Sequence, residues 1–463
     1  MPLPDDATAL VEQVAGGERT AAAVLELSLD RIAQHDPALR AFSVVLADEA
    51  RAEAAARDAE LARGRARGPL HGVPVAVKEE LDVAGCVTTF GGRGNRTSAA
   101  EDGEVVRRLR AAGAVIVGKT QMPEFGQWPF TESVAYGHTR NPWDLTRSPG
   151  GSSGGTAAAV AAGLVPVAIG GDGGGSIRIP AACCGIFGLK PQRGRVSSGP
   201  NAHLWWALGT VGPLSRTVRD SALVYDAIRG NAPTDVFTAA DPAESFSAAA
   251  DREPGRLRIG WSAKPVSLGV RPDPVNVQAL RDTARLLADL GHDVREIDPA
   301  YPDPTAAFVP QFLGGVRAEA ELVEDTRALE RRTHQTLLMG RWATDKVVRG
   351  AIRRGEEVER KANRVFDDVD VLLTPTIACR PPRLGRLDGA GTVRAALRSM
   401  PMIAYTALWN VTGNPAASVP VGLGPDGLPL AVQLVGRTGD EGTLLSLSAQ
   451  VEAAQPFPVP PLG

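Results

Sequence analysis

Short runs of apolar residues alternate with longer segments of helical character, and this alternation constrains the fold more than any other feature of the chain. Apolar runs occur at residues 72–78 (GVPVAVK), 114–118 (AVIVG) and 165–169 (VPVAI). Each has the length and continuous apolar character of a strand that is buried on both faces. Helical patterns at residues 103–112 and 156–164 separate these runs. Strands that alternate with helices predict an α/β sheet that is covered on both faces.

The same alternation extends towards both ends of the chain. Helices are predicted over residues 20–35, where Asp36-Pro37 ends the first of them, and over residues 47–64. A helix-rich, Arg-rich stretch from about 303 to 366 interrupts the later strands. These later elements are a strand at 256–261, a helix at 275–290 and strands at 292–297, 369–376, 418–423 and 430–437.

The chain carries no internal repeat and no low-complexity linker, and its weakest region is the polar, Ala-rich stretch 240–255. Open α/β sheets in enzymes can be large. We therefore expect a single large α/β unit over residues 1–463.

Composition argues against several classes of function. Apolar residues make up 43% of the chain and charged residues 22%, which is an ordinary globular mixture. The net charge is -3 and no basic stripe carries aromatic residues, so we expect no nucleic-acid partner. The N-terminus lacks the basic and apolar segments of a secretory signal, and the weakly polar run 157–169 is too short to span a bilayer. We expect a soluble, cytoplasmic protein with no membrane partner.

The cysteines and histidines do not form a metal-binding pattern. Cys86, Cys183, Cys184 and Cys379 contain no C-x-x-C pair, and the six histidines include no H-E-x-x-H motif. The cysteine usage fits buried thiols in a reducing compartment. We expect neither a structural nor a catalytic zinc ion.

Two motifs match the signatures of other enzyme classes only in part. Residues 113–120 (GAVIVGKT) fit the phosphate-loop pattern, but their variable positions are those of a strand and not of a flexible loop. Residues 150–155 (GGSSGG) contain the nucleophile-elbow pattern of α/β-hydrolases, which would make Ser153 the nucleophile. That class needs a histidine late in the chain, and the last histidine here is His334.

Residues 170–180 (GGDGGGSIRIP) place three glycines directly before Ser176. Such glycines let backbone N–H groups converge on one point and stabilise an oxyanion beside a nucleophile, although a plain turn explains them equally well. Lys78 ends the apolar run 72–78. Burial there would favour its neutral amine, which can act as a base, whereas a lone lysine at a strand end is more often a solvated charge.

Taken together, Lys78, the pair Ser152-Ser153 and Ser176 resemble the amidase signature family. The resemblance covers roughly residues 20 to 455, and the core of the signature lies at about 70–200. The matching segments are 72–85, 88–92, 118–120, 139–143, 148–181, 184–191, 410–422 and 427–437.

This resemblance implies both a mechanism and a fold. Ser176 would be the nucleophile, Ser152 a relay held in a cis peptide, and Lys78 the general base of an acyl-enzyme reaction that needs no cofactor. The family fold is an α/β/α sandwich around a mixed sheet. The family also implies an oxyanion hole formed by Gly173, Gly174, Gly175 and the Ser176 amide, with Ser153, Asp172 and Arg178 as supporting residues.

Some positions depart from the family pattern. Gly171 and Gly173 stand where the family often has serine or threonine, so a supporting hydroxyl is missing. Glu79-Glu80 replaces the common Asp-Asn after the lysine, and Cys183 stands where a larger or polar residue is frequent.

Aromatic residues in two loop-like segments predict the substrate class. Each of them alone would be explained as a core residue, but their number favours an apolar pocket. The substrate would be a small-molecule amide, and an aryl amide, a carbamate or an ester would suit it, as in an aryl acylamidase or a urethanase. The pocket would include the helix-rich region 303–366 and the residues Phe125, Gln127, Trp128, Phe130, Trp205 and Trp206.

An alternative function would require a partner protein. The family includes the glutaminase subunit of the tRNA-dependent amidotransferase, which acts together with another protein. The resemblance also allows a homodimer.

Overall fold

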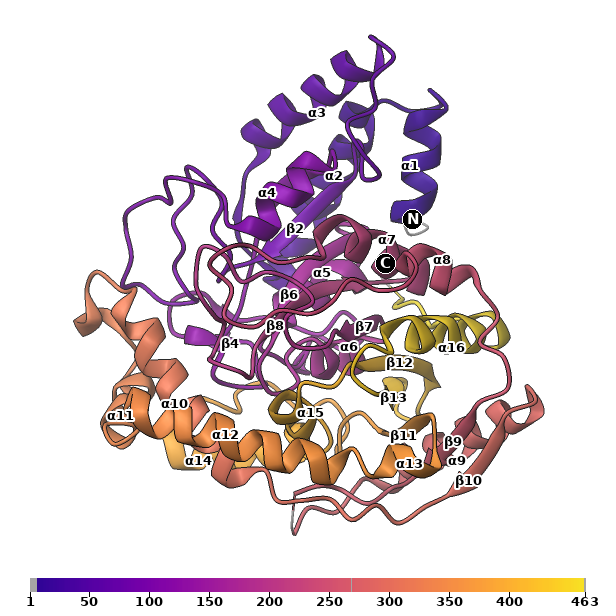
Figure 1. The fold of residues 1–463 in the computed structure, drawn as a ribbon. Coiled ribbons are helices and arrows are strands. Elements are labelled where there is room, and N and C mark those ends of the chain that lie inside the picture. The colour runs from indigo at the N-terminus through magenta and orange to yellow at the C-terminus, as the bar shows by residue number, and fades with distance from the viewer. Residues whose placement is uncertain (1–5, 268, 462–463) are drawn as a thin grey trace.

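One mixed sheet of eleven strands runs through the molecule (Figure 1). The computed structural model describes residues 6–267 and 269–461. The spatial order of the strands is β1-β3-β2-β6-β8-β7-β12-β13-β11-β9-β10, and β4 and β5 form a separate hairpin. In chain order the strands are β1 Phe42–Val45, β2 Pro74–Lys78, β3 Val115–Thr120, β4 Glu132–Ser133, β5 Gly137–His138, β6 Val167–Asp172, β7 Phe187–Lys190, β8 Thr210–Ser215, β9 Arg258–Trp261, β10 Asp293–Glu296, β11 Val371–Pro375, β12 Ala416–Leu423 and β13 Pro429–Val435.

Parallel and antiparallel pairs are combined in this sheet. Strand β2 lies parallel to β3 and β6, and β9 lies parallel to β10 and β11. The remaining neighbours are antiparallel. The predicted mixed sheet with helices on both faces is therefore confirmed. Because β2 and β6 are parallel neighbours, their last residues, Lys78 and Asp172, lie at the same edge of the sheet.

Successive residues of a strand point to opposite faces, so each strand serves two helical layers. In β2, Val75 and Val77 pack into one core, whereas Ala76 packs into the other. The first layer holds α1 Ala7–Ala15, α4 Glu104–Ala111, α7 Val218–Ile228, α8 Phe246–Asp251, α9 Pro274–Asp289 and α16 Glu441–Ala454. The second layer holds α2 Ala21–Leu39, α3 Ala47–Leu61, α5 Gly154–Ala161 and α6 Arg178–Cys184.

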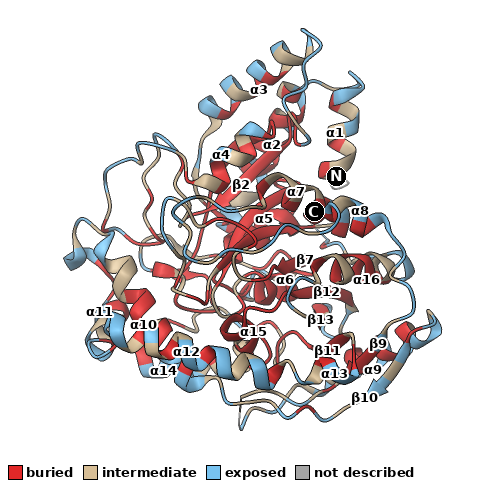
Figure 2. Ribbon diagram, viewed as in Figure 1, coloured by how far each residue is buried: buried red, intermediate tan, exposed pale blue. Residues whose placement is uncertain are grey.

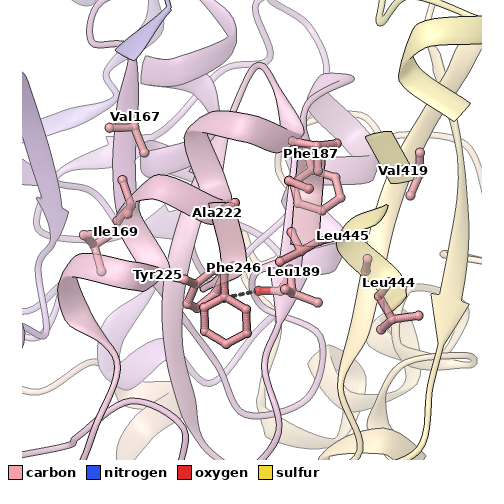
Figure 3. Close-up of a cluster of buried hydrophobic side chains, with 14 of the residues drawn as sticks. Val167, Ile169, Phe187, Leu189, Ala222, Tyr225, Phe246, Val419, Leu444 and Leu445 are labelled. Atoms are coloured by element: carbon pink, nitrogen blue, oxygen red, sulfur yellow. Dashed lines mark hydrogen bonds between the residues drawn. The ribbon is translucent and has the colours of Figure 1, made fainter. Parts of the chain in front are cut away.

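The first layer contains a large continuous cluster of buried apolar side chains. Figure 3 shows Ile169 and Phe187 of the sheet close to Tyr225 of α7 and Leu445 of α16. The Tyr225 hydroxyl donates a hydrogen bond to the Leu189 carbonyl, so its polar end is also satisfied. Figure 2 shows the same distribution over the whole molecule, because the strands and inner helices are buried while the outer faces of α3 and α12 are exposed.

The helix-rich stretch expected at 303–366 is present. It forms α10 Thr305–Glu321, α11 Arg331–Met339, α12 Asp345–Ala362 and α13 Val365–Asp368, which are joined by α14 Thr392–Ile403 and α15 Ala407–Thr412. Figure 1 shows α10, α11, α12 and α14 grouped at one side of the molecule. Two short 3-10 turns complete the described elements, η1 Glu124–Gly126 and η2 Thr326–Ala328.

The predicted end of the first long helix is wrong. Helix α2 continues through Asp36 and Pro37 to Leu39. Asp36 stays helical and its carboxylate accepts the backbone N–H groups of Ala41 and Phe42, which fixes the turn into β1. Pro37 lies in the last turn, where it removes few helical hydrogen bonds.

Within the described ranges, the helices are too short or too polar to cross a membrane. All four cysteines carry free thiols.

Candidate active site

Lys78 is the last residue of β2, a strand with neighbours on both sides. Its side chain is 2% exposed, so the lysine is buried more deeply than the sequence pattern required. The Nζ atom donates a hydrogen bond of 2.8 Å to Ser152 Oγ and lies 3.1 Å from Glu80 Oε1.

Ser152 lies in the loop that leads into α5, and the Gly151–Ser152 peptide bond is cis. A Cβ atom at Gly151 would lie 2.7 Å from the Phe130 backbone nitrogen, so only glycine fits there. The Ser152 side chain faces the same cavity as Lys78 and Ser176. The structure therefore brings the three residues of the predicted triad to one site.

Ser153 has a different environment from Ser152. It is fully buried, and its hydroxyl donates to the Gly171 carbonyl at 3.1 Å and accepts the Gly171 N–H at 3.2 Å. These two bonds attach the serine loop to β6. Ser153 does not line the cavity, which argues against the nucleophile-elbow interpretation.

The loop between β6 and α6 presents Ser176 to the cavity. Asp172 organises this loop, because Oδ1 accepts the Gly175 N–H at 2.6 Å and Oδ2 accepts the Ile177 N–H at 3.1 Å. Thr406 Oγ1 donates to the Gly174 carbonyl at 2.7 Å. Both sides of the peptide between Gly174 and Gly175 are thus held by hydrogen bonds.

Gly175 must be glycine for two reasons. Its φ is +126°, a value that residues with a side chain rarely adopt, and a Cβ atom would lie 2.4 Å from Thr406 Oγ1. Its N–H donates to Asp172 and is not free for an oxyanion. Of the residues predicted to form an oxyanion hole, Gly173, Gly174 and Ser176 line the cavity, whereas Gly175 does not.

Arg178 does not face the substrate but holds the loop from behind. It is fully buried and forms two hydrogen bonds of 3.0 Å to the Asp172 carboxylate. Burial opposes ionisation of Asp172, but the charge and hydrogen bonds of Arg178 outweigh it and hold the pKa of Asp172 below its usual range. The other acceptors of the guanidinium are Thr406 O, Asn410 Oδ1 and Gln433 Oε1.

The cavity in front of Ser176 has a volume of about 410 Å³ and an apolar wall. Phe312 lies at the centre of an aromatic group, with ring centroids 6.1 Å from Trp128, 5.4 Å from Trp205 and 6.1 Å from Phe308. Helix α14 adds Met400 and Ile403. The charged residues that line it, within the described part of the chain, are Lys78, Glu80 and Asp172.

Three of the six predicted pocket residues line this cavity, namely Gln127, Trp128 and Trp205. The other three do not. Phe125 packs edge-on against Phe90, and Phe130 is fully buried in the apolar cluster that lies behind Trp128. Trp206 does not line the cavity and stacks on His203, with ring centroids 4.5 Å apart. For Phe125 and Phe130 the alternative explanation, that they fill the core, fits better, whereas Trp206 is half-buried outside the cavity.

The sequence analysis assigned the region 303–366 to the pocket but named none of its side chains, and it did not include α14. Phe308 and Phe312 lie four residues apart on one face of α10, and Thr392, Ala396, Ser399 and Ile403 repeat at helical spacing in α14. The periodicity of 392–403 could have identified α14 as a helix with one apolar face. Nothing in that pattern distinguishes a face that lines a cavity from a face that packs in a core.

The chain has close relatives in sequence and in structure. The model of the Amidase family matches residues 23–445. A Mycobacterium tuberculosis protein named as an amidase, AmiB2, is 48% identical over 97% of this chain and 96% of its own length. The 6-aminohexanoate-cyclic-dimer hydrolase of Paenarthrobacter ureafaciens is 37% identical over 98% of this chain and 95% of its own length.

Solved structures agree with these relatives. A 6-aminohexanoate cyclic dimer hydrolase complexed with substrate superposes with a TM-score of 0.89 at 34% identity, covering 98% of this chain and 97% of the other. A bacterial aryl acylamidase of the amidase signature enzymes superposes with a TM-score of 0.87 at 29% identity, with the same coverage. The chain therefore belongs to the amidase signature family, whose members hydrolyse amide carbon–nitrogen bonds.

Proposed function

We propose that this protein hydrolyses neutral amides with an aryl or alkyl group through an acyl-enzyme on Ser176. The observation that carries the proposal is the hydrogen bond of 2.8 Å from Lys78 Nζ to Ser152 Oγ, in the same apolar cavity as Ser176. A buried amine that contacts a hydroxyl beside a nucleophile is an arrangement for removing the nucleophile's proton.

The proposed reaction has two halves. Ser176 Oγ attacks the carbonyl carbon, its proton passes to Ser152 and the proton of Ser152 passes to Lys78. The negative charge on the carbonyl oxygen is stabilised by the N–H groups of Gly173, Gly174 and Ser176. Lys78 then returns its proton through Ser152 to the leaving amine. Water attacks the acyl-enzyme by the same route and releases the acid.

The charge distribution of the cavity supports a neutral substrate. The donors of Arg178 are directed to Asp172 and to residues of the C-terminal half, so Arg178 is not available to bind a substrate carboxylate. The Trp128, Trp205 and Phe312 rings offer apolar area to an aryl or alkyl group. This arrangement favours a hydrolase of apolar amides over a glutaminase subunit, whose substrate carries a carboxylate and an ammonium group.

The test is a comparison of kcat/KM for an anilide, an aryl carbamate, a short aliphatic amide, the cyclic dimer of 6-aminohexanoate and glutamine. We expect the anilide to exceed glutamine by about tenfold to a hundredfold, because one buried aromatic group contributes about 1.5–3 kcal/mol. The carbamate uses the same oxyanion hole and should also turn over. A preference for glutamine, or for any amide that carries a carboxylate, would refute the proposal.

A further inference from the structure

Lys78 has a second polar neighbour besides Ser152. The Glu80 Oε1 atom lies 3.1 Å from Lys78 Nζ, and the Glu80 side chain is 7% exposed. Glu80 also lines the cavity. The lysine amine therefore lies between a hydroxyl on the side of the nucleophile and a carboxylate two residues further along the chain.

The room for this carboxylate is created by a glycine on the neighbouring strand. A Cβ atom at Gly171 would lie 2.2 Å from Glu80 Oε1, which no real contact allows. A residue with a side chain at position 171 would therefore push Glu80 away from the lysine. The two departures from the family pattern, glycine at 171 and glutamate at 80, are thus matched to each other in space.

A third ionisable group faces this pair from α10. Burial, followed by the Glu80 carboxylate, raises the pKa of Glu319 to about 8, although the Lys78 charge opposes this effect. The charge of Asp82 acts on Glu319 in the same direction as that of Glu80. Glu319 therefore favours its neutral form more than an ordinary glutamate does, and Glu80 is the acid that lies next to the Lys78 amine.

We propose that Glu80 is a positioning residue that holds Lys78 against Ser152 and stabilises the ammonium group formed when Lys78 accepts a proton. The inference rests on the proposed acyl-enzyme reaction. In acylation the proton of Ser176 moves to Ser152, and the proton of Ser152 moves to Lys78. Lys78 gains one positive charge, which the Glu80 carboxylate faces, and loses it when the leaving amine is protonated. Glu80 itself neither gains nor loses a proton in this sequence.

The proposal has a consequence that a merely structural residue would not produce. A carboxylate beside an amine favours the charged form, and Lys78 can accept a proton only when it is neutral. Glu80→Gln should therefore move the acid limb of the kcat/KM profile for an anilide to lower pH, by about 1 to 3 pH units. The plateau should fall by about tenfold or more, because the ammonium group is less stabilised in the transition state.

The experiment compares pH profiles from pH 5 to pH 10 for wild type, Glu80→Gln, Glu80→Asp and Gly171→Ala, with thermal unfolding to confirm folding. Gly171→Ala should reproduce the shift of Glu80→Gln. The double variant Glu80→Ala/Gly171→Ala should have an acid limb close to that of Glu80→Ala alone, because the side chain that Gly171→Ala would displace is then absent. Glu80→Asp should recover part of the plateau. Asp82→Asn is the matched control, because Asp82 is a nearby acid that does not line the cavity and accepts a hydrogen bond from Thr88.

The experiment distinguishes a failure of the Glu80 proposal from a failure of the proposed function. An acid limb that stays in place in folded Glu80→Gln would overturn the role of Glu80, as would an equal shift in Asp82→Asn. Retention of anilide turnover in Lys78→Ala would instead overturn the proposed function itself. Loss of turnover in Lys78→Ala with an unshifted Glu80→Gln would remove only the inference about Glu80.

Discussion

At the scale of single residues, the site combines groups that react with groups that only hold them. Ser176, Ser152 and Lys78 share the cavity, whereas Ser153 and Arg178 are buried behind it with their polar atoms hydrogen bonded. Substitution of a reacting residue should therefore lower turnover without unfolding the protein, whereas substitution of a buried supporting residue should also affect the fold.

The first prediction concerns the nucleophile. Ser176→Ala should lower anilide turnover by at least about a thousandfold without unfolding the protein, because it removes the attacking oxygen. Mass spectrometry after reaction with an aryl phosphonate should show an adduct on wild type and none on the variant. An adduct that persists in Ser176→Ala and disappears in Ser153→Ala would instead support a nucleophile elbow.

The second prediction concerns the base. Anilide hydrolysis by wild type should increase from acid to mildly alkaline pH, because Lys78 must be neutral to accept a proton. Lys78→Ala should lower anilide turnover by about 10²- to 10⁴-fold but retain more activity on an activated aryl ester, whose leaving group needs little protonation. A wild-type rate that decreases between neutral and mildly alkaline pH, while the protein stays folded, would argue against a lysine base.

At the scale of elements, the sequence predicted strands better than the walls of the cavity. The runs around Val75 and Ile116 are apolar on both faces, and such a run has few alternatives to a buried strand. The prediction that Ser152 and Ser176 share one site came from the family resemblance of the glycine-serine block. The structure gives a physical reason for the glycines, since only glycine fits where backbones approach as closely as at Gly151.

The positions of Phe308, Phe312 and Trp206 could not be predicted in the same way. An apolar helix face looks the same in sequence whether it covers a core or a cavity. Whether such a face lines a cavity depends on contacts that form only in the folded chain. Of two adjacent tryptophans, Trp205 lines the cavity, whereas Trp206 stacks on His203. The sequence showed that Glu80 and Gly171 each depart from the family pattern. It did not show that the two residues are in contact.

The third prediction concerns α10. Phe312 contacts Trp128 and Trp205, so Phe312→Ala should raise KM for an anilide by about tenfold or more and change KM for a short aliphatic amide much less. The control is Leu322→Ala, because Leu322 is an exposed apolar residue just beyond the end of the same helix. Equal losses on both substrates would show that Phe312 supports the fold and does not select the substrate.

At the scale of the whole molecule, helices from the two ends of the chain are joined by a buried acid, Asp220, and a half-buried acid, Glu452. The Glu452 carboxylate of α16 accepts the Val218 N–H at the start of α7, and Asp220 of α7 accepts the Ala7 and Thr8 N–H groups of α1. Burial is the main cause that raises the pKa of Glu452 to about 7, and the charges of Asp220 and Asp6 add to it.

The fourth prediction follows from this pKa. The folded value lies above the ordinary value of 4.5, so the contribution of Glu452 to stability is fully present below pH 4.5 and is lost as the pH increases through about 7. Glu452→Gln should therefore stabilise the protein by about 1 to 3 kcal/mol at pH 8 and by much less at pH 5. Calorimetric Tm values at both pH values measure this, and exposed Glu296→Gln is the control. A variant with equal effects at pH 5 and pH 8 would contradict the assignment.

The contacts of Arg178 have a further consequence for how the enzyme is made. Its partners Thr406, Asn410 and Gln433 follow it by 228, 232 and 255 positions in the chain. At about 5–20 residues per second, a ribosome needs roughly 10 to 50 s to synthesise that interval. Until then the guanidinium lacks three acceptors, and burying it would be costly. We therefore expect a truncated chain that ends at residue 400 to be unreactive with the phosphonate probe. The nascent enzyme would then remain inactive until its synthesis is nearly finished.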